Sequence, residues 1–377
     1  RSVKMMRKSV LRCLFPILVL AMVLAGCGGG GGGGTTPPVK PEPEFVCETV
    51  DDTAEVGIAT SIAVDADGRP HISYVDQTNG ALKYARWTGS AWSIETVDSA
   101  DGGSVSWTSI ALDGQGYPHI SYCPYSYQGG DSDLKYARWT GSAWSIETVD
   151  SDGRVGIYNS IALDDSGHPH IAYYDNTNDD LKYARWTGSA WSIQTVDSNG
   201  RVGSDCSMDL DGGNNPHISY CDVTNYNLKY ATWDGNSWLT TTADGAEYTG
   251  IRTSIAVDAN GYPHISYFDE MNCALKYARW NGSAWLTETV DIDAGGEVGD
   301  YSSIALDADG HPHISYFHID NGDLKYAEWN GSSWEIRILD SAGYVGEFSS
   351  LALDADGYPH ISYRDATNTA LKYCGYR

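Results

Sequence analysis

Seven copies of one short motif constrain the fold of this 377-residue chain more than any other feature. The tripeptide Pro-His-Ile recurs every 47 to 51 residues, and each copy is followed by Leu-Lys-Tyr. A pair of tryptophans five residues apart follows six of the seven copies. Repeats of this length build stacked or ring-shaped architectures, because one unit alone cannot bury its hydrophobic face. The seven motif histidines are His71, His119, His170, His217, His264, His313 and His360.

Each unit predicts four short strands, which we name A to D in chain order. In the first unit they cover residues 61–65, 70–74, 82–87 and 92–97. Polar and apolar residues alternate along these segments, β-branched and aromatic residues are enriched, and Asp-Gly or Asn-Gly turns separate several of them. Four strands at a period near 48 residues, repeated seven times, predict an all-β fold: a seven-bladed β-propeller with four-stranded blades.

The ends of the repeat region favour a closed ring over an open solenoid. Residues 45–51 match strand D of the first unit, whereas the seventh unit ends within strand C. We therefore expect the N-terminal strand D to join the last blade and close the ring, which leaves the ring with no open end.

The same register predicts two disulfides, provided that the hairpin turns are symmetric. One joins Cys47 to Cys374 across the closing hairpin, and the other joins Cys206 to Cys221 between strands A and B of the fourth unit. An oxidising envelope compartment would favour both bridges. Cys123 and Cys273 lie three blades apart and are expected to stay unpaired.

Residues that recur in every unit are interpreted as structural, because a residue present in every blade serves every blade. The repeated histidine is expected to bridge strands through both ring nitrogens. The first aspartate of each A–B turn, such as Asp65, would cap the turn or accept a bond from that histidine or from the repeated lysine. The third position of the turn varies, which argues against repeated calcium loops. We predict no metal site and no cofactor.

One loop position differs from unit to unit and marks the candidate ligand site. The D–A loops share a Gly-x-x-x-Ser frame, and the residue two before the serine should surround the channel mouth. Aromatic rings there would stack on apolar faces of sugars, and charged groups would bind hydroxyls or carboxylates. The alternative is that the residue at this position varies by sequence drift without a function. Tyr125 and Tyr127, in a longer B–C loop of the second unit, should lie on the same face, and His318 replaces an aspartate found in five units. The seven positions are Ala59, Trp107, Tyr158, Asp205, Arg252, Tyr301 and Phe348.

The N-terminal segment resembles a bacterial lipoprotein signal peptide. Residues 1–26 are basic and then apolar, and Leu24-Ala25-Gly26-Cys27 resembles a lipobox. The resemblance implies a lipid on Cys27, a Gly- and Pro-rich tether over 27–43, and a propeller over 44–377. Glycine rather than aspartate after the cysteine implies the outer membrane of the cell envelope.

Over 44–377 the chain resembles seven-bladed propellers of the lectin-like and sialidase-like kind. Sialidases use three arginines, whereas the predicted ring has only Arg252, with Arg364 as a possible neighbour. We therefore expect a surface-anchored binding module for a glycan or a protein partner, as a monomer. The alternatives are a glycan-cleaving hydrolase or lyase, with Asp205 paired to Asp175 or Asp222, and a scaffold of an envelope complex. A net charge of −26 argues against nucleic acid, and membrane contact is expected through the lipid only.

Overall fold

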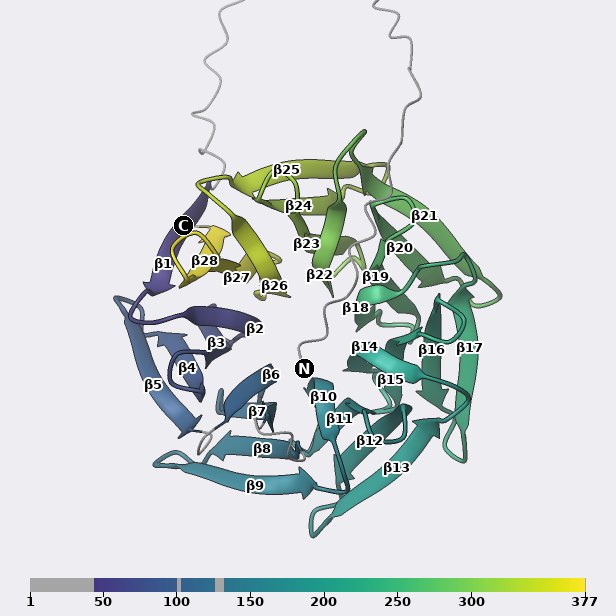
Figure 1. Ribbon diagram of the computed structural model, residues 1–377, viewed down its shortest axis with the longest axis horizontal. Helices are drawn as coiled ribbons and strands as arrows, with labels where there is room; N and C mark the ends of the chain where they lie inside the picture. The colour runs from purple at the N-terminus through teal and green to yellow at the C-terminus, as the bar shows by residue number, and fades with distance from the viewer. Residues whose placement is uncertain (1–43, 100–102, 126–131, 377) are drawn as a thin grey trace, which may run out of the picture. The chain divides into compact units, whose positions relative to one another are not determined.

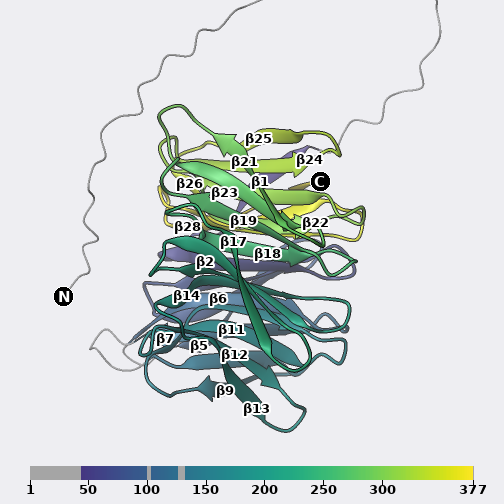
Figure 2. The same cartoon turned by 90° about the vertical axis from the view of Figure 1, so that its right-hand side faces the viewer.

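A computed structural model describes residues 44–99, 103–125 and 132–376. Residues 45–376 form seven four-stranded antiparallel sheets arranged as a ring, and this confirms the predicted propeller (Figure 1). Figure 2 shows the ring from its side, with the strands running across its thickness. The described residues contain no helix, and so none long and apolar enough to cross a membrane. The predicted signal peptide, Cys27 and the tether lie outside the described residues.

Each blade contributes its strands from the channel outward. Blades 1 to 3 consist of β2 (Val56–Val64), β3 (Pro70–Asp76), β4 (Ala81–Trp87) and β5 (Trp92–Ser99); β6 (Ser104–Leu112), β7 (Pro118–Tyr125), β8 (Leu134–Trp139) and β9 (Trp144–Asp150); and β10 (Val155–Leu163), β11 (Pro169–Asp175), β12 (Asp180–Trp186) and β13 (Trp191–Asp197). Blades 4 and 5 consist of β14 (Val202–Leu210), β15 (Pro216–Asp222), β16 (Asn227–Trp233) and β17 (Trp238–Asp244); and β18 (Ile251–Val257), β19 (Pro263–Asp269), β20 (Ala274–Trp280) and β21 (Trp285–Ile292). Blades 6 and 7 consist of β22 (Val298–Leu306), β23 (Pro312–His318), β24 (Asp323–Trp329) and β25 (Trp334–Asp340); and β26 (Val345–Leu353), β27 (Pro359–Asp365), β28 (Ala370–Tyr376) and β1 (Phe45–Asp51).

The ring closes as predicted, because β1 pairs with β28 and completes blade 7. Cys47 lies opposite Cys374 in this pairing, and the two form a disulfide with their Cα atoms 4.0 Å apart. Both the closure and its bridge are confirmed.

The second predicted bridge is wrong, because strand A is bulged. In blade 4 the register shifts between Ser204 and Ser207, so that Cys221 lies opposite Ser204 rather than Cys206. The Cys206 thiol instead donates to the Tyr158 carbonyl of blade 3 at 3.0 Å. Cys206 and Cys221 are buried free thiols, and Cys123 and Cys273 are also free, as expected.

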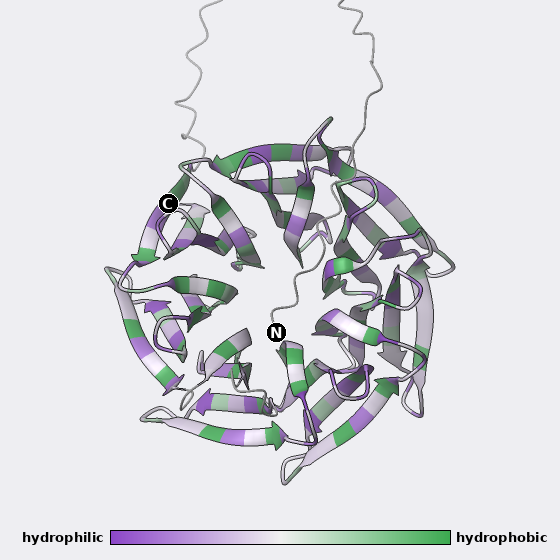
Figure 3. Cartoon of the chain, in the orientation of Figure 1, coloured by the Kyte–Doolittle hydropathy of each residue, from purple (hydrophilic) through white to green (hydrophobic). Residues whose placement is uncertain are grey.

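Hydrophobic clusters fill the spaces between neighbouring blades. Between blades 1 and 2, for example, Leu82 and Tyr84 of one blade pack with Ile110, Ile120 and Tyr122 of the next. The colouring of Figure 3 shows polar and apolar residues alternating along the strands. The inner strand β3 is nevertheless buried along its whole length, because Tyr74 packs toward blade 7 and Val75 packs toward blade 2. The core is therefore a series of like interfaces around the channel.

An aspartate–lysine pair crosses each of these interfaces, and its aspartate is buried in five of the seven and half-buried in the other two, Asp98 and Asp291. Asp51, at the end of β1, accepts bonds from Tyr74 (2.7 Å) and Lys83 (2.5 Å) of blade 1. Burial alone would raise the pKa of Asp51, but the bonds from Lys83, Thr53 and Tyr74 outweigh it and lower the pKa to about 2. The repeated lysine thus pairs with the strand-D aspartate of the preceding blade and not with the A–B turn. The other six aspartates are Asp98, Asp150, Asp197, Asp244, Asp291 and Asp340.

The repeated histidines bridge the strands as predicted. In blade 1, His71 Nδ1 lies 2.5 Å from the Tyr84 hydroxyl and its Nε2 lies 3.4 Å from Asp65. Asp65 also caps the A–B turn, accepting from the backbone nitrogens of Asp67 and Arg69 at 2.9 Å each. Burial lowers the pKa of all seven histidines, to about 4 for His264.

We predict that losing the closure disulfide destabilises the domain. The bridge closes a loop with a sequence separation of 327 residues, so in the chain-entropy model it contributes up to about 5 kcal/mol. Urea unfolding of a Cys47→Ser/Cys374→Ser variant should show this loss, whereas Cys273→Ser should match the wild type. Equal unfolding midpoints for the double variant and the wild type would contradict the prediction.

We also predict that mild acid destabilises the fold through the buried histidines. Their pKa values lie below the 6.5 of the unfolded chain, so the unfolded state binds more protons as pH falls. The free energy of unfolding should therefore fall steadily from about pH 6.5 toward pH 4. In His264→Gln the slope of this decline should shrink by about one proton. A pH-independent free energy over this range would refute the prediction.

Candidate functional site: the channel mouth

All seven predicted mouth positions line one cavity of about 170 Å³ at the start of the inner strands. This volume lies below the 300–1,000 Å³ typical of small-molecule sites, so the mouth suits a single ring or a chain end rather than a long ligand. The neighbouring threonine, serine, asparagine or cysteine of each loop completes the lining, for example Thr60 and Asn159.

A left-handed backbone turns these side chains toward the mouth. Six of the seven positions have φ between 49° and 54°, although none is glycine. The frame glycine two residues earlier must lack a side chain because it lies close to the neighbouring blade. A Cβ on Gly57 would lie 2.9 Å from the Ala370 carbonyl oxygen of blade 7. Non-glycine residues with positive φ are uncommon and cluster at functional sites.

Trp107 is the exception to this geometry. Blade 2 has Val105 where the other blades have the frame glycine, and a side chain there is incompatible with the same close approach. The bulge is accordingly smaller, and Trp107 pairs directly with Cys123 of β7. The tryptophan thus enters the mouth from a different backbone conformation than its six counterparts.

A charged cluster occupies one side of the mouth. Arg252 of blade 5 lies 3.5 Å from Asp205 of blade 4 and 3.3 Å from Asp300 of blade 6. Its guanidinium also covers the Tyr301 ring at 4.4 Å. Burial raises the pKa of both carboxyls, and the charge of Arg252 opposes that rise. Two carboxyl groups therefore share one arginine.

Aromatic pairs flank this cluster on both sides. Trp107 meets Tyr158 edge to face at 4.9 Å, and Tyr301 meets Phe348 at 4.4 Å. The charge of Asp205, together with burial, raises the pKa of Tyr158, so this hydroxyl stays protonated at neutral pH. Because Arg252 covers Tyr301, the Trp107–Tyr158 pair offers the freer aromatic surface.

Sequence reasoning missed Asp300, which is as close to Arg252 as Asp205 is. The residue immediately before each mouth position could have indicated it. At that place two of the seven blades have an acid, Asp300 and Glu347. Arg364, proposed as a neighbour of the ring, instead binds Glu55 and Glu347 at 3.1 Å each and does not line the cavity.

The other residues noted near this face have local partners. Tyr125 lies 5.9 Å from the Arg154 guanidinium, while Tyr127 is outside the described residues. His318 contacts Asn321 at 2.9 Å and Asp293 at 3.3 Å, within the loops of blade 6.

The predicted acid–base pair is not assembled. Asp175 accepts from the Thr177 nitrogen and from Asn178, and Asp222 does the same with the equivalent Thr224 and Asn225. Both aspartates therefore cap B–C turns, and neither lines the cavity that Asp205 lines.

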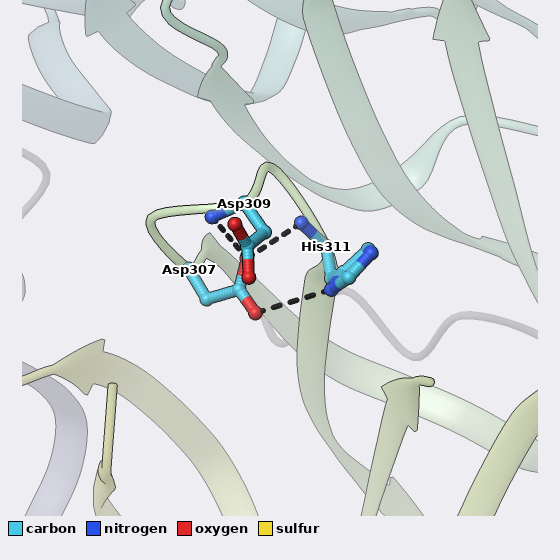
Figure 4. A group of neighbouring side chains, drawn as sticks. All are labelled: Asp307, Asp309 and His311. Carbon is cyan, nitrogen blue, oxygen red and sulfur yellow. Dashed lines mark hydrogen bonds and ion pairs between the residues drawn. The ribbon is translucent and has the colours of Figure 1, made fainter. Parts of the chain in front are cut away.

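One A–B turn, on the opposite face, brings together three potential metal ligands. Figure 4 shows Asp307, Asp309 and His311, the one such group found among the described residues. Asp307 already accepts from both backbone nitrogens of the turn, and its second oxygen lies 3.3 Å from His311 Nδ1. Blade 3 makes the same contact between Asp164 and His168, so turn capping accounts for the arrangement.

Comparisons with known proteins extend the fold assignment only. Neither a protein-family model nor a curated protein matches the sequence. The structure is similar to a polysaccharide lyase described as an ulvan lyase (TM-score 0.59, 14% identity, covering 85% of this chain and 94% of that one). The same lyase bound to -[GlcA(1-4)Rha3S]- matches with a TM-score of 0.57 and 15% identity, over 88% of this chain and 94% of that one. AofleA from Arthrobotrys oligospora matches with a TM-score of 0.54 and 14% identity, over 80% of this chain and 91% of that one.

We predict that Arg252→Leu destabilises the fold in a pH-dependent way. The substitution leaves Asp205 and Asp300 as unpaired, largely buried carboxylates, which should cost about 2 kcal/mol at pH 7. Because acid neutralises both carboxyls, the difference from the wild type should shrink as pH falls toward 5. Chemical unfolding at several pH values measures this difference. A deficit that is constant over this range would argue against the charged cluster.

Proposed function

We propose that this chain is a glycan-binding module held at the bacterial cell envelope by a lipid on Cys27. The observation that carries the proposal is the convergence, in one cavity, of the loop position whose residue type differs most among the blades. An otherwise repetitive ring gains a distinct surface only where its repeated positions differ.

The chemistry of the mouth supports a carbohydrate ligand. The Trp107–Tyr158 pair provides an aromatic face for a sugar ring, and Asp205 and Arg252 provide acceptors and donors for hydroxyl groups. Arg252 is the one arginine or lysine among the described residues of the lining and already pairs with Asp205 and Asp300, so the mouth offers no unpaired cation to a carboxylated sugar and favours a neutral residue. The saccharide bound to the ulvan lyase supports carbohydrate binding by a propeller of this fold.

The localisation rests on the sequence of the N-terminal segment. The lipobox-like Leu24-Ala25-Gly26-Cys27 and the following glycine support anchoring at the outer membrane. The tether over 27–43 would give the propeller freedom to reach a ligand near that surface.

Two competing functions lead to different experimental outcomes. Glycan cleavage has support from the lyase fold and from the raised pKa of Asp205, and it requires polysaccharide turnover that Asp205→Asn abolishes. A protein ligand at the mouth, or a scaffold role through the outer blade edges, requires partner capture without glycan binding.

We predict that Trp107→Ala weakens glycan binding about tenfold, through loss of the stacking surface. The measurement is a glycan array with the soluble domain, followed by affinity measurement for the glycans that bind. Tyr226→Ala is the control, since Tyr226 is an exposed aromatic residue in the B–C loop of blade 4 that does not line the cavity. Binding that Trp107→Ala leaves unchanged would remove the mouth as the site.

A further inference from the structure

Two grooves on the opposite face of the ring are larger than the mouth. One lies between blades 1 and 2, with a volume of about 760 Å³, and the other lies between blades 5 and 6, with about 440 Å³. Both volumes fall within the range of small-molecule sites, whereas the mouth cavity does not. The grooves open beside the A–B turns and C–D hairpins, at the other end of the strands from the D–A loops.

The two grooves are lined by equivalent residues. In each, a buried His–Tyr pair forms the floor, an arginine and a glutamate form one rim, and a tryptophan of the next blade forms the facing wall. The sets are His71, Tyr84, Arg86, Glu95 and Trp139 in the first groove, and His264, Tyr277, Arg279, Glu288 and Trp329 in the second.

Sheet register explains why these side chains converge. His264 lies opposite Arg279, and Tyr277 lies opposite Glu288, in adjacent cross-strand pairs. Because side chains two residues apart share a sheet face, the histidine, tyrosine, arginine and glutamate all point toward the next blade. The floor is fixed, since His264 Nδ1 lies 2.5 Å from the Tyr277 hydroxyl.

Both charged side chains of the rim are exposed. Arg279 is exposed and forms no ion pair with any residue in the described part of the chain, while Glu288 accepts from the Trp334 indole at 3.1 Å. In the second groove, Arg279 and Glu288 balance each other in charge. Acidic groups are in excess in the first groove, whose lining also contains Arg69, Asp65, Asp67 and Asp113. Guanidinium donors and a carboxylate acceptor side by side match the hydroxyl groups of a sugar, and the half-buried tryptophan offers a face for its apolar side.

Other blades vary the same two positions in ways that change the chemistry. Blade 6 exchanges them, so that Glu328 and Arg337 form an ion pair at 2.6 Å and satisfy each other. Blade 4 has Thr232 and Thr241 in these places and presents no charge. Blade 2 has Arg138 and Glu147, the same pair as in the two grooves.

We propose that the grooves carrying an arginine and a glutamate are a second set of sites, which bind neutral saccharides. The inference goes beyond the mouth and rests on the proposed glycan function for its ligand class. Several like sites on one face would bind a repetitive or clustered glycan with avidity that no single groove provides.

The experiment titrates the soluble domain with D-glucose, D-galactose, D-mannose, L-fucose and N-acetyl-D-glucosamine, with D-glucuronate and N-acetylneuraminate as anionic comparators. Saturation-transfer NMR detects binding and calorimetry gives affinities. The test variant is Arg86→Ala/Arg138→Ala/Arg279→Ala, which alters only exposed side chains. Thr232→Ala is the matched control at the equivalent position of blade 4, which carries no charged pair, and thermal unfolding checks that each variant is folded.

We expect at least one neutral sugar to bind, the triple variant to lose at least tenfold in affinity, and Thr232→Ala to match the wild type. Sugar binding that the triple variant retains but Trp107→Ala abolishes would overturn the groove proposal and leave the mouth proposal standing. The reverse pattern would overturn the mouth proposal and support the grooves. Preference for the anionic sugars, or binding of none of the seven, would also overturn the groove proposal.

Discussion

The aspartate that each blade gives to the next blade, buried in five of the seven cases, is the contact on which the rest of the structure depends. Hydrophobic packing between sheets has no direction, so it would tolerate neighbouring blades sliding past each other. A carboxylate that must accept hydrogen bonds from both a lysine and a tyrosine does not tolerate such sliding. Asp51 accepts these bonds from Lys83 and Tyr74. Removing one partner of such a buried pair leaves an uncompensated charge and typically costs about 3–5 kcal/mol. Seven such contacts fix the height and rotation of every blade, and hence the convergence of the loops at the mouth.

The repeat made the fold predictable, and the local backbone limited what else could be predicted. Alignment of units placed Cys47 opposite Cys374, because that hairpin is regular along the strands that carry them. It failed for Cys206 and Cys221, since the hairpin was assumed to be symmetric, whereas a bulge in strand A shifts its register between Ser204 and Ser207. The variable mouth positions were found because they break the repeat, yet Asp300 was missed because it lies one position away from them.

Residues that recur in every unit are interpreted as structural, and the bonded, buried His264–Tyr277 pair agrees with that interpretation. The arginine and glutamate of the C–D hairpins recur in only some blades, so this rule leaves them unassigned. Arg279 is exposed and lines a groove, unlike the buried histidine and tyrosine beneath it. A recurring residue is therefore identified as structural only when its side chain is buried and its polar atoms are hydrogen-bonded within the protein.

The strand that closes the ring also sets the order in which the domain can be finished. Strand β1 is the first strand of the propeller to be synthesised, but its partner β28 is the last. Blade 7 therefore stays incomplete until the whole chain has been made, and native pairing of the two ends is among the slowest contacts that a chain of this length can form. The Cys47–Cys374 disulfide therefore forms only after the ring has closed, because it joins two segments that meet only in the complete ring.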